Sequence, residues 1–244
     1  MTLEEAIAKI KPLDHNAMEI AQKRWDSIAK PLHSLGKLET LLIQIAGITG
    51  NAEVDLSRRG LIAMCADNGV VEEGVTQTGQ EVTAIVAENF LKYDTSVGVM
   101  CKQNHAEIFP VDMGMVTDTK VRTDHKIAYG TQNMTKGPAM TREQAVKGLE
   151  AGIDMVRELN DKGYRILATG EMGIGNTTTS SAVASVLLKQ PVEEMTGRGA
   201  GLTSEGLVRK INAIKKAIAL NKPDPEDAID VLAKVGGLDI AGMA

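Results

Sequence analysis

Apolar residues recur every three or four positions over residues 3–50, which is the spacing of one helix face. The first series begins at Leu3, and the second runs from Leu38 to Ile48. Between them, the segment KPLHSLG at residues 30–36 carries a proline and a glycine and breaks the pattern. The sequence therefore predicts a small helical domain over residues 1–55.

From residue 60 onward, short apolar runs alternate with longer helical patterns. The helical patterns cover residues 80–93, 95–103, 142–162, 177–188, 204–221 and 225–235. The apolar runs predict strands at residues 61–66, 107–112 and 164–169, with a weaker candidate at 121–128. Strand–helix alternation is typical of parallel sheets, because a parallel connection needs a crossover. We therefore expect an α/β domain over residues 56–244, with a parallel Rossmann-like sheet flanked by helices and ligands at the carboxyl ends of its strands.

A glycine-rich loop follows the predicted strand 164–169 and leads into the helix 177–188. Its sequence is TGEMGIGNTTTSS, and it contains Gly173, Gly175, Asn176, Thr177 and Thr178. Glycines let a ligand approach the backbone closely, and the free amides and positive dipole end of a helix favour an anion, most often phosphate. One carboxylate, Glu171, lies inside this loop. The pattern predicts a phosphate held by backbone amides, with an acidic group beside it.

A second glycine-rich loop, GRGAGL at residues 197–202, precedes the predicted helix 204–221. Gly199, Ala200 and Gly201 make it a second candidate phosphate site. Lys210 follows within the helix, where it either reaches back to the anion or lies on the surface as a solvated group. Neither loop matches GxGxxG or GxxxxGK[ST], so dinucleotide and P-loop sites are disfavoured.

Other polar residues follow strands or stand between glycines. Asp67 and Asn68 come directly after strand 61–66 and form either a wall of the substrate cleft or an ordinary turn. Asp112 ends the next predicted strand. Asp239 lies between the glycine pair at residues 236–237 and Gly242. The loop GTQNMTKGPAM at residues 130–140 offers hydrogen bonds to a sugar or shapes a long connection.

Composition narrows the function classes. The net charge of −5 disfavours a broad nucleic-acid surface, and no apolar run is long enough to span a membrane. Cys65 and Cys101 lack the spacing of a metal or redox motif, so we expect reduced cysteines. The four histidines show no ligand spacing, so we expect no metal site. No GxSxG motif is present, and nucleophilic hydrolase chemistry is therefore disfavoured. The acidic N-terminus does not look like a signal peptide, which favours the cytoplasm.

Six segments, taken in order, resemble one family closely. They read KPLHSLGKLE (30–39), ADNGVVEEGV (66–75), VDMG (111–114), GPAM (137–140), GEMGIGNTT (170–178) and KVGGLDIAGM (234–243). Together they resemble the nicotinate-nucleotide–dimethylbenzimidazole phosphoribosyltransferases, which build the lower nucleotide loop of cobalamin. The resemblance implies a cytoplasmic homodimer without metal or cofactor, with a parallel α/β domain and a small helical domain. It also implies transfer of phosphoribose from nicotinate mononucleotide to 5,6-dimethylbenzimidazole or a related base, with release of nicotinate.

The resemblance implies roles for individual residues. Glu171 would lie beside the reacting carbon, and Lys210 matches a family lysine near the site. Thr78 and Val86 would line the base pocket, where the family commonly has serine and glutamine. The residues expected to bind substrate are Asp67, Asn68, Thr78, Val86, Gly173, Gly175, Asn176, Thr177, Thr178, Gly199, Ala200, Gly201 and Asp239.

Family members carry a further C-terminal segment with a Gly-Glu-Gly loop whose glutamate is the principal catalytic base, whereas this chain stops at Ala244. An alternative is therefore a non-catalytic protein that binds a nucleotide or base, or a truncated pseudoenzyme without that glutamate. A nucleotide-dependent oxidoreductase is disfavoured, because the glycine spacing is wrong.

Overall fold

The computed structural model describes residues 1–244, which divide into two compact units. One unit comprises Glu4–Arg58, and the other comprises Met1–Leu3 with Arg59–Ala244. No helix is both long and apolar enough to cross a bilayer.

The smaller unit is helical, as the periodicity predicts. Its helices are α1 (Leu3–Ala8, which begins at the unit boundary), α2 (His15–Ser27) and α3 (Lys37–Thr49). The turn between α2 and α3 is closed by a buried ion pair of 2.8 Å between Lys30 Nζ and Glu39 Oε1. The same oxygen accepts a hydrogen bond of 3.0 Å from the Leu35 amide. These contacts give the first family-like segment, residues 30–39, a structural role.

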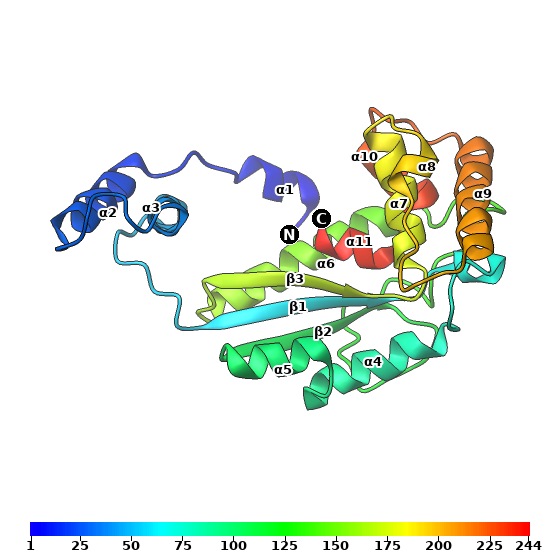
Figure 1. The fold of residues 1–244 in the computed structure, drawn as a ribbon, viewed down its shortest axis with the longest axis horizontal. Helices are drawn as coiled ribbons and strands as arrows, with labels where there is room; N and C mark the ends of the chain where they lie inside the picture. Colours follow the sequence, from blue (N-terminus) through cyan, green and yellow to red (C-terminus); the bar gives the residue numbers. More distant parts are fainter. The chain divides into compact units, whose positions relative to one another are not determined.

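The larger unit contains a parallel sheet of three strands in the order β2-β1-β3 (Figure 1). The strands are β1 (Arg59–Ala66), β2 (Ala106–Gly114) and β3 (Ile166–Met172). In the centre of the sheet, Met64 pairs with Val111 on one side and with Glu171 on the other. The three main strand predictions and the α/β class are confirmed.

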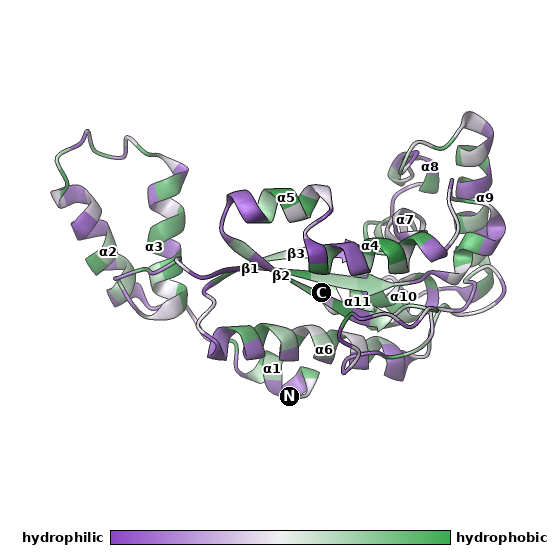
Figure 2. Cartoon of the chain, turned by 90° about the horizontal axis from the view of Figure 1, so that it is seen from below, coloured by the Kyte–Doolittle hydropathy of each residue, from purple (hydrophilic) through white to green (hydrophobic).

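Helices cover both faces of the sheet. Helices α4 (Glu81–Lys92) and α5 (Ser96–Gln103) lie on one face, where Ala63 and Cys65 enter the core with Phe90. Helices α6 (Arg142–Asp161) and α11 (Leu238–Met243) lie on the other, over Ile62 and Met64. Figure 2 shows the layers from a second direction, with α5 and α6 on opposite sides of the strands. Successive side chains of β1 point to opposite faces of the sheet, because a strand has a two-residue period, and they therefore enter the two cores in turn.

Helix α11 approaches α6 closely, and the contact requires glycine. A Cβ on Gly152 of α6 would lie 2.3 Å from the Gly242 carbonyl oxygen of α11. A Cβ on Gly148 would lie 2.6 Å from the Ala241 side chain. The short helix α11 is thereby held between α6 and the sheet.

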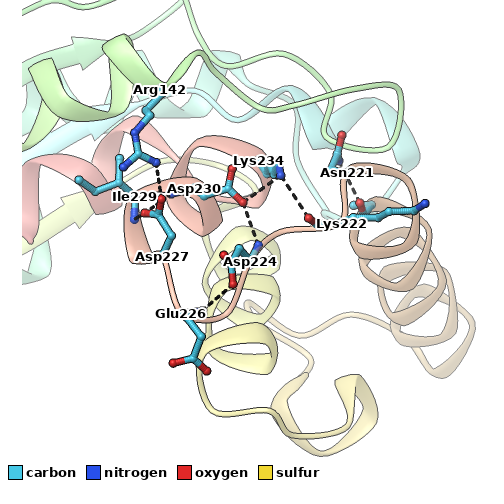
Figure 3. Close-up of polar contacts among 10 residues, drawn as sticks. Arg142, Asn221, Lys222, Asp224, Glu226, Asp227, Ile229, Asp230 and Lys234 are labelled. Atoms are coloured by element: carbon cyan, nitrogen blue, oxygen red, sulfur yellow. Dashed lines mark hydrogen bonds and ion pairs between the residues drawn. The ribbon is translucent and has the colours of Figure 1, made fainter.

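A second group of helices lies beyond the carboxyl ends of the strands (Figure 1). It comprises the 3-10 helix η1 (Gly69–Glu73) and helices α7 (Asn176–Leu187), α8 (Val192–Met195), α9 (Ser204–Asn221) and α10 (Ala228–Val235). Figure 3 shows how polar contacts hold α10 in place. Asp227 caps the helix and accepts a 2.7 Å contact from Arg142 of α6, while Lys234 binds Asp230 at 2.9 Å and the Lys222 carbonyl oxygen at 3.1 Å.

One strand prediction is wrong. Residues 121–128 form no strand, although Arg122 makes an isolated bridge to Val111 and the Ile127 amide donates to the Met113 carbonyl oxygen. The polar residues that interrupt the apolar pattern explain this: Arg122 binds Glu158, and Lys126 turns inward to the buried Asp112 at 3.1 Å. The short elements η1, α8 and α11 were not predicted, because each spans too few residues to show a period.

Candidate functional site

Both glycine-rich loops line one cavity of about 120 Å³ at the carboxyl end of the sheet. Its walls also include the segment after η1. The structure brings six of the expected residues to this cavity: Thr78, Gly175, Asn176, Thr177, Gly199 and Ala200. The remaining lining residues are Val75, Thr76, Gln77, Ile174, Arg198 and Leu202.

Gly175 places the backbone at the start of α7. It is the N-cap residue, with φ of 94° and no side-chain cap, so the positive end of the helix faces the loop. A Cβ at this position would lie 3.0 Å from Val71 and 3.2 Å from Asn68 Cβ. Only glycine combines this left-handed φ with so close an approach. The first amides of α7 already donate to the Gly173 carbonyl oxygen, to Asn176 Oδ1 and to the Gly175 carbonyl oxygen. The feature of this loop that favours an anion is therefore the positive end of the helix dipole.

Lys210 lies between the two glycine loops, behind the residues that line the cavity, and Arg198 is the charged side chain that lines it. Lys210 extends from α9, is 1% exposed, and donates to Thr177 Oγ1 at 2.7 Å and to the Gly197 carbonyl oxygen at 3.2 Å. No carboxylate lies within ion-pair distance, and burial lowers its pKa. The alternative of a solvated surface lysine is wrong. A buried cation that meets only neutral oxygens between two glycine loops is suited to an anionic ligand.

Glu171 lies at the end of β3, half-buried, and does not line the cavity. Its Oε2 accepts a short hydrogen bond from the side chain of Asn176, which does line the cavity. Asn176 thus connects the carboxylate to the first turn of α7. The carboxylate therefore lies beside the start of α7, and its place next to a bound phosphate stays a prediction.

Outside the glycine loops, three residues expected to bind substrate are completely buried: Asp67, Asn68 and Asp239. Asp67 accepts from the Val116 amide at 2.8 Å, and burial raises its pKa. Asn68 donates to Asp239 at 3.4 Å. Burial and then the charge of Glu171 raise the pKa of Asp239 to about 7. These side chains lie behind the loops and have no exposed surface, so direct contact with substrate stays a prediction.

The other expected residues do not line the cavity. Gly173 forms the turn after β3, and a Cβ there would lie 2.4 Å from the Ala66 carbonyl oxygen. Thr178 is buried in α7, and Val86 is a half-buried residue of α4 that packs against the core. The Gly201 carbonyl oxygen accepts a hydrogen bond from the Gln77 side chain.

Sequence reasoning missed Gln77 and Arg198. Arg198 lines the cavity and donates to the Leu202 carbonyl oxygen at 2.8 Å and to Ser204 Oγ at 3.1 Å. Arg198 lies inside the second glycine loop, so its position in the sequence could have been used to predict that it lines the site. Gln77 carried no signal of its own, since its role depends on the approach of a distant loop.

The loop 130–140 has a structural role in this structure. Asn133 and Thr135 both donate to Glu73 Oε1 at 2.8 Å, and Thr131 Oγ1 accepts from the Gly69 amide at 3.0 Å. Its polar side chains therefore hold η1 rather than facing a sugar. No group of three or more His, Cys, Asp or Glu side chains is arranged to hold a metal ion.

Comparison with known proteins gives a consistent result. The family model described as Phosphoribosyltransferase matches residues 10–244. Nicotinate-nucleotide–dimethylbenzimidazole phosphoribosyltransferases from Ruminiclostridium cellulolyticum and Clostridium acetobutylicum are 53% and 52% identical, and each match covers 100% of this chain and 70% of the relative. The crystal structure of CobT from Thermus thermophilus superimposes with a TM-score of 0.84 at 35% identity, covering 93% of this chain and 69% of that one. The chain belongs to the nicotinate-nucleotide–dimethylbenzimidazole phosphoribosyltransferase family.

Proposed function

We propose that this protein transfers phosphoribose from nicotinate mononucleotide to 5,6-dimethylbenzimidazole or a related base, giving α-ribazole phosphate and nicotinate. The observation that carries the proposal is Lys210, a buried lysine without a carboxylate partner where two glycine loops meet. A 5′-phosphate supplies the missing negative charge. The family relationship supplies the reaction class.

The chemistry requires little activation of the leaving group. The nicotinate nitrogen is already a pyridinium, so breaking its bond to C1′ returns the electron pair to a neutral ring. The incoming imidazole nitrogen attacks from the opposite face, which inverts β to α. Positive charge grows on the ribose and the incoming ring, and a nearby carboxylate stabilises it and accepts the proton of the other ring N–H, which leaves a neutral ring in the product.

Glu171 is the residue proposed for that role. Asn176 holds its Oε2 beside the first turn of α7, while Lys210 and the amides of the glycine loops hold the phosphate. Phosphate binding orients C1′, and such positioning can exceed the contribution of an acid–base group, which is about 10²–10⁴-fold. The proposed base pocket includes Thr78, which lines the cavity, and Val86, which would need the base to reach α4.

The assembly and location remain part of the proposal. We infer a homodimer in the cytoplasm, with residues 1–55 as the helical domain and residues 56–244 as the phosphoribosyl-binding domain. Light scattering of the purified protein tests the dimer.

The direct test is incubation with nicotinate mononucleotide and 5,6-dimethylbenzimidazole, with both products quantified by chromatography. Stoichiometric nicotinate and α-ribazole phosphate support the transfer. Binding of the nucleotide without release of nicotinate would instead support a non-catalytic binding protein. Lys210→Met serves as the matched variant, in which both nucleotide binding and nicotinate release should be weakened.

A further inference from the structure

Three chain segments meet behind the glycine loop: the end of β1, the turn after β3 and the start of α11. Asp239 of α11 is the centre of this junction and is 0% exposed. Its Oδ1 accepts from the Ile240 amide at 2.9 Å, and its Oδ2 accepts from Asn68 Nδ2 at 3.4 Å. The same Asn68 amide nitrogen donates to the Ile174 carbonyl oxygen at 3.5 Å. Asp239 is thus connected through Asn68 to the turn that follows Glu171.

The junction has no spare volume. A Cβ on Gly173 would lie 2.6 Å from Asp239 Oδ2, and a Cβ on Gly237 would lie 2.2 Å from Asp239 Oδ1 and 2.6 Å from Asn68 Oδ1. These distances are below any ordinary carbon–oxygen contact. The Asp239 carboxyl therefore fixes how closely α11 and the turn after β3 approach each other.

The hydrogen bonding at the junction favours a proton on Asp239. Asn68 Oδ1 is buried and has no hydrogen-bond partner. Asn68 Oδ1 and Asp239 Oδ1 both lie next to the position that a Cβ on Gly237 would occupy, so the two oxygens face the same small space. A protonated carboxyl offers a donor to this side of Asn68, whereas an ionised one offers only acceptors. Burial and the charge of Glu171 raise the pKa of Asp239 to about 7, so the proton is exchanged near neutrality.

The ionisable groups of the surrounding elements leave Glu171 as the relevant neighbour. On β1, burial raises the pKa of the Cys65 thiol, which therefore stays neutral. Directly after β1, burial also raises the pKa of Asp67, whose Oδ2 accepts from the Val116 amide at 2.8 Å. On β2, Asp112 is paired with Lys126 at 3.1 Å. Helix α6 meets α11 through glycines, and Glu171 at the end of β3 is the charged group that acts on Asp239.

We propose that Asp239 is a positioning residue for Glu171: its buried carboxyl holds the turn after β3 through Asn68, and its charge is coupled to that of Glu171 during the reaction. The inference rests on the proposed phosphoribosyl transfer. Loss of the Asp239 proton places a second negative charge behind Glu171 and strengthens the field on the cationic ribosyl centre. Turnover should therefore increase as Asp239 ionises.

The first test is a ¹³C NMR titration of the aspartate carboxyl carbons in the free protein, with Asp239→Asn assigning the resonance. The Asp239 midpoint is expected near pH 7, lower in Glu171→Gln, and unchanged in Asp161→Asn, a surface control on α6. A midpoint near pH 4, or one that Glu171→Gln does not move, overturns the coupling. This measurement requires no transferase activity, so its outcome is independent of the proposed function.

The second test is the pH dependence of kcat. The wild-type kcat is expected to rise severalfold through one ionisation near pH 7, and Asp239→Asn, which keeps the shape of the side chain, should remove that step. A step that persists in Asp239→Asn overturns the proposal. Absence of product in the wild type at every pH would refute the proposed transfer, while the NMR titration still decides the coupling.

Discussion

Replacing Lys210 with methionine should stabilise the free protein and weaken nucleotide binding. The change keeps a long, unbranched side chain in the 1% exposed position and removes the charge. A buried charge carries a desolvation penalty of several kcal/mol. The two hydrogen bonds to Thr177 and Gly197 offset part of this penalty, but burial still lowers the pKa of Lys210, which indicates that the charged form is disfavoured in the native protein. We therefore expect the free energy of unfolding to rise by about 1–2 kcal/mol.

The effect on binding has the opposite sign. A hydrogen bond to a charged group contributes about 1.5–3 kcal/mol, and about 1.4 kcal/mol corresponds to a tenfold change in Kd. The Kd for nicotinate mononucleotide should rise roughly 10- to 150-fold. Urea unfolding measures the first quantity, and calorimetric titration measures the second. Lys215→Met on the same helix is the control, because Lys215 is half-exposed and paired with Glu193.

The pH dependence of stability gives an independent check on Lys210. Burial lowers the pKa of Lys210 below its ordinary value of 10.5, so above the native pKa the unfolded chain binds more protons than the native protein. The Lys210 contribution to the free energy of unfolding therefore rises with pH toward 10.5, and Lys210→Met should abolish it. Destabilisation by Lys210→Met together with an unchanged Kd would refute this account of the site.

Three further substitutions test other parts of the structure. Glu171→Gln should lower kcat on the order of 10²-fold while leaving the nucleotide Kd within about twofold, and equal turnover would remove Glu171 from the reacting centre. Gly175→Val, at φ of 94° and 3.0 Å from Val71, should weaken nucleotide binding in the same titration; unaltered affinity would contradict the close-contact loop. Gly152→Ala should lower the free energy of unfolding by about 1–3 kcal/mol, since its Cβ would meet the Gly242 carbonyl oxygen at 2.3 Å. A neutral result in urea would show that α11 can shift away from α6.

Local patterns were sufficient to predict the scaffold. The runs that became β1 and β2 are apolar because helices bury both faces of these strands, whereas β3 is an edge strand without a fully buried residue. Long helices such as α6 show a clear period. The failed strand at residues 121–128 shows the limit. Arg122 and Lys126 interrupt its pattern, and their partners Glu158 and Asp112 are distant in the sequence.

Side-chain roles depended on tertiary contacts that no local pattern contains. Asp67 comes directly after a strand and Asp239 follows a pair of glycines, which are positions where substrate-binding residues are often found. Both side chains are nevertheless fully buried. Lys210 was ambiguous in sequence and became informative only through its burial and its bond to Thr177. Polar residues at strand ends thus predict the place of a site better than they predict which side chains face the ligand.

The most direct test of the central claim is a crystal structure of the protein with nicotinate mononucleotide. The account predicts that the 5′-phosphate occupies the cavity between Gly175 and Gly199, within hydrogen-bond distance of Lys210 Nζ, with C1′ turned toward Glu171. A nucleotide bound elsewhere, with this cavity empty and Lys210 still bonded only to Thr177 and Gly197, would contradict it.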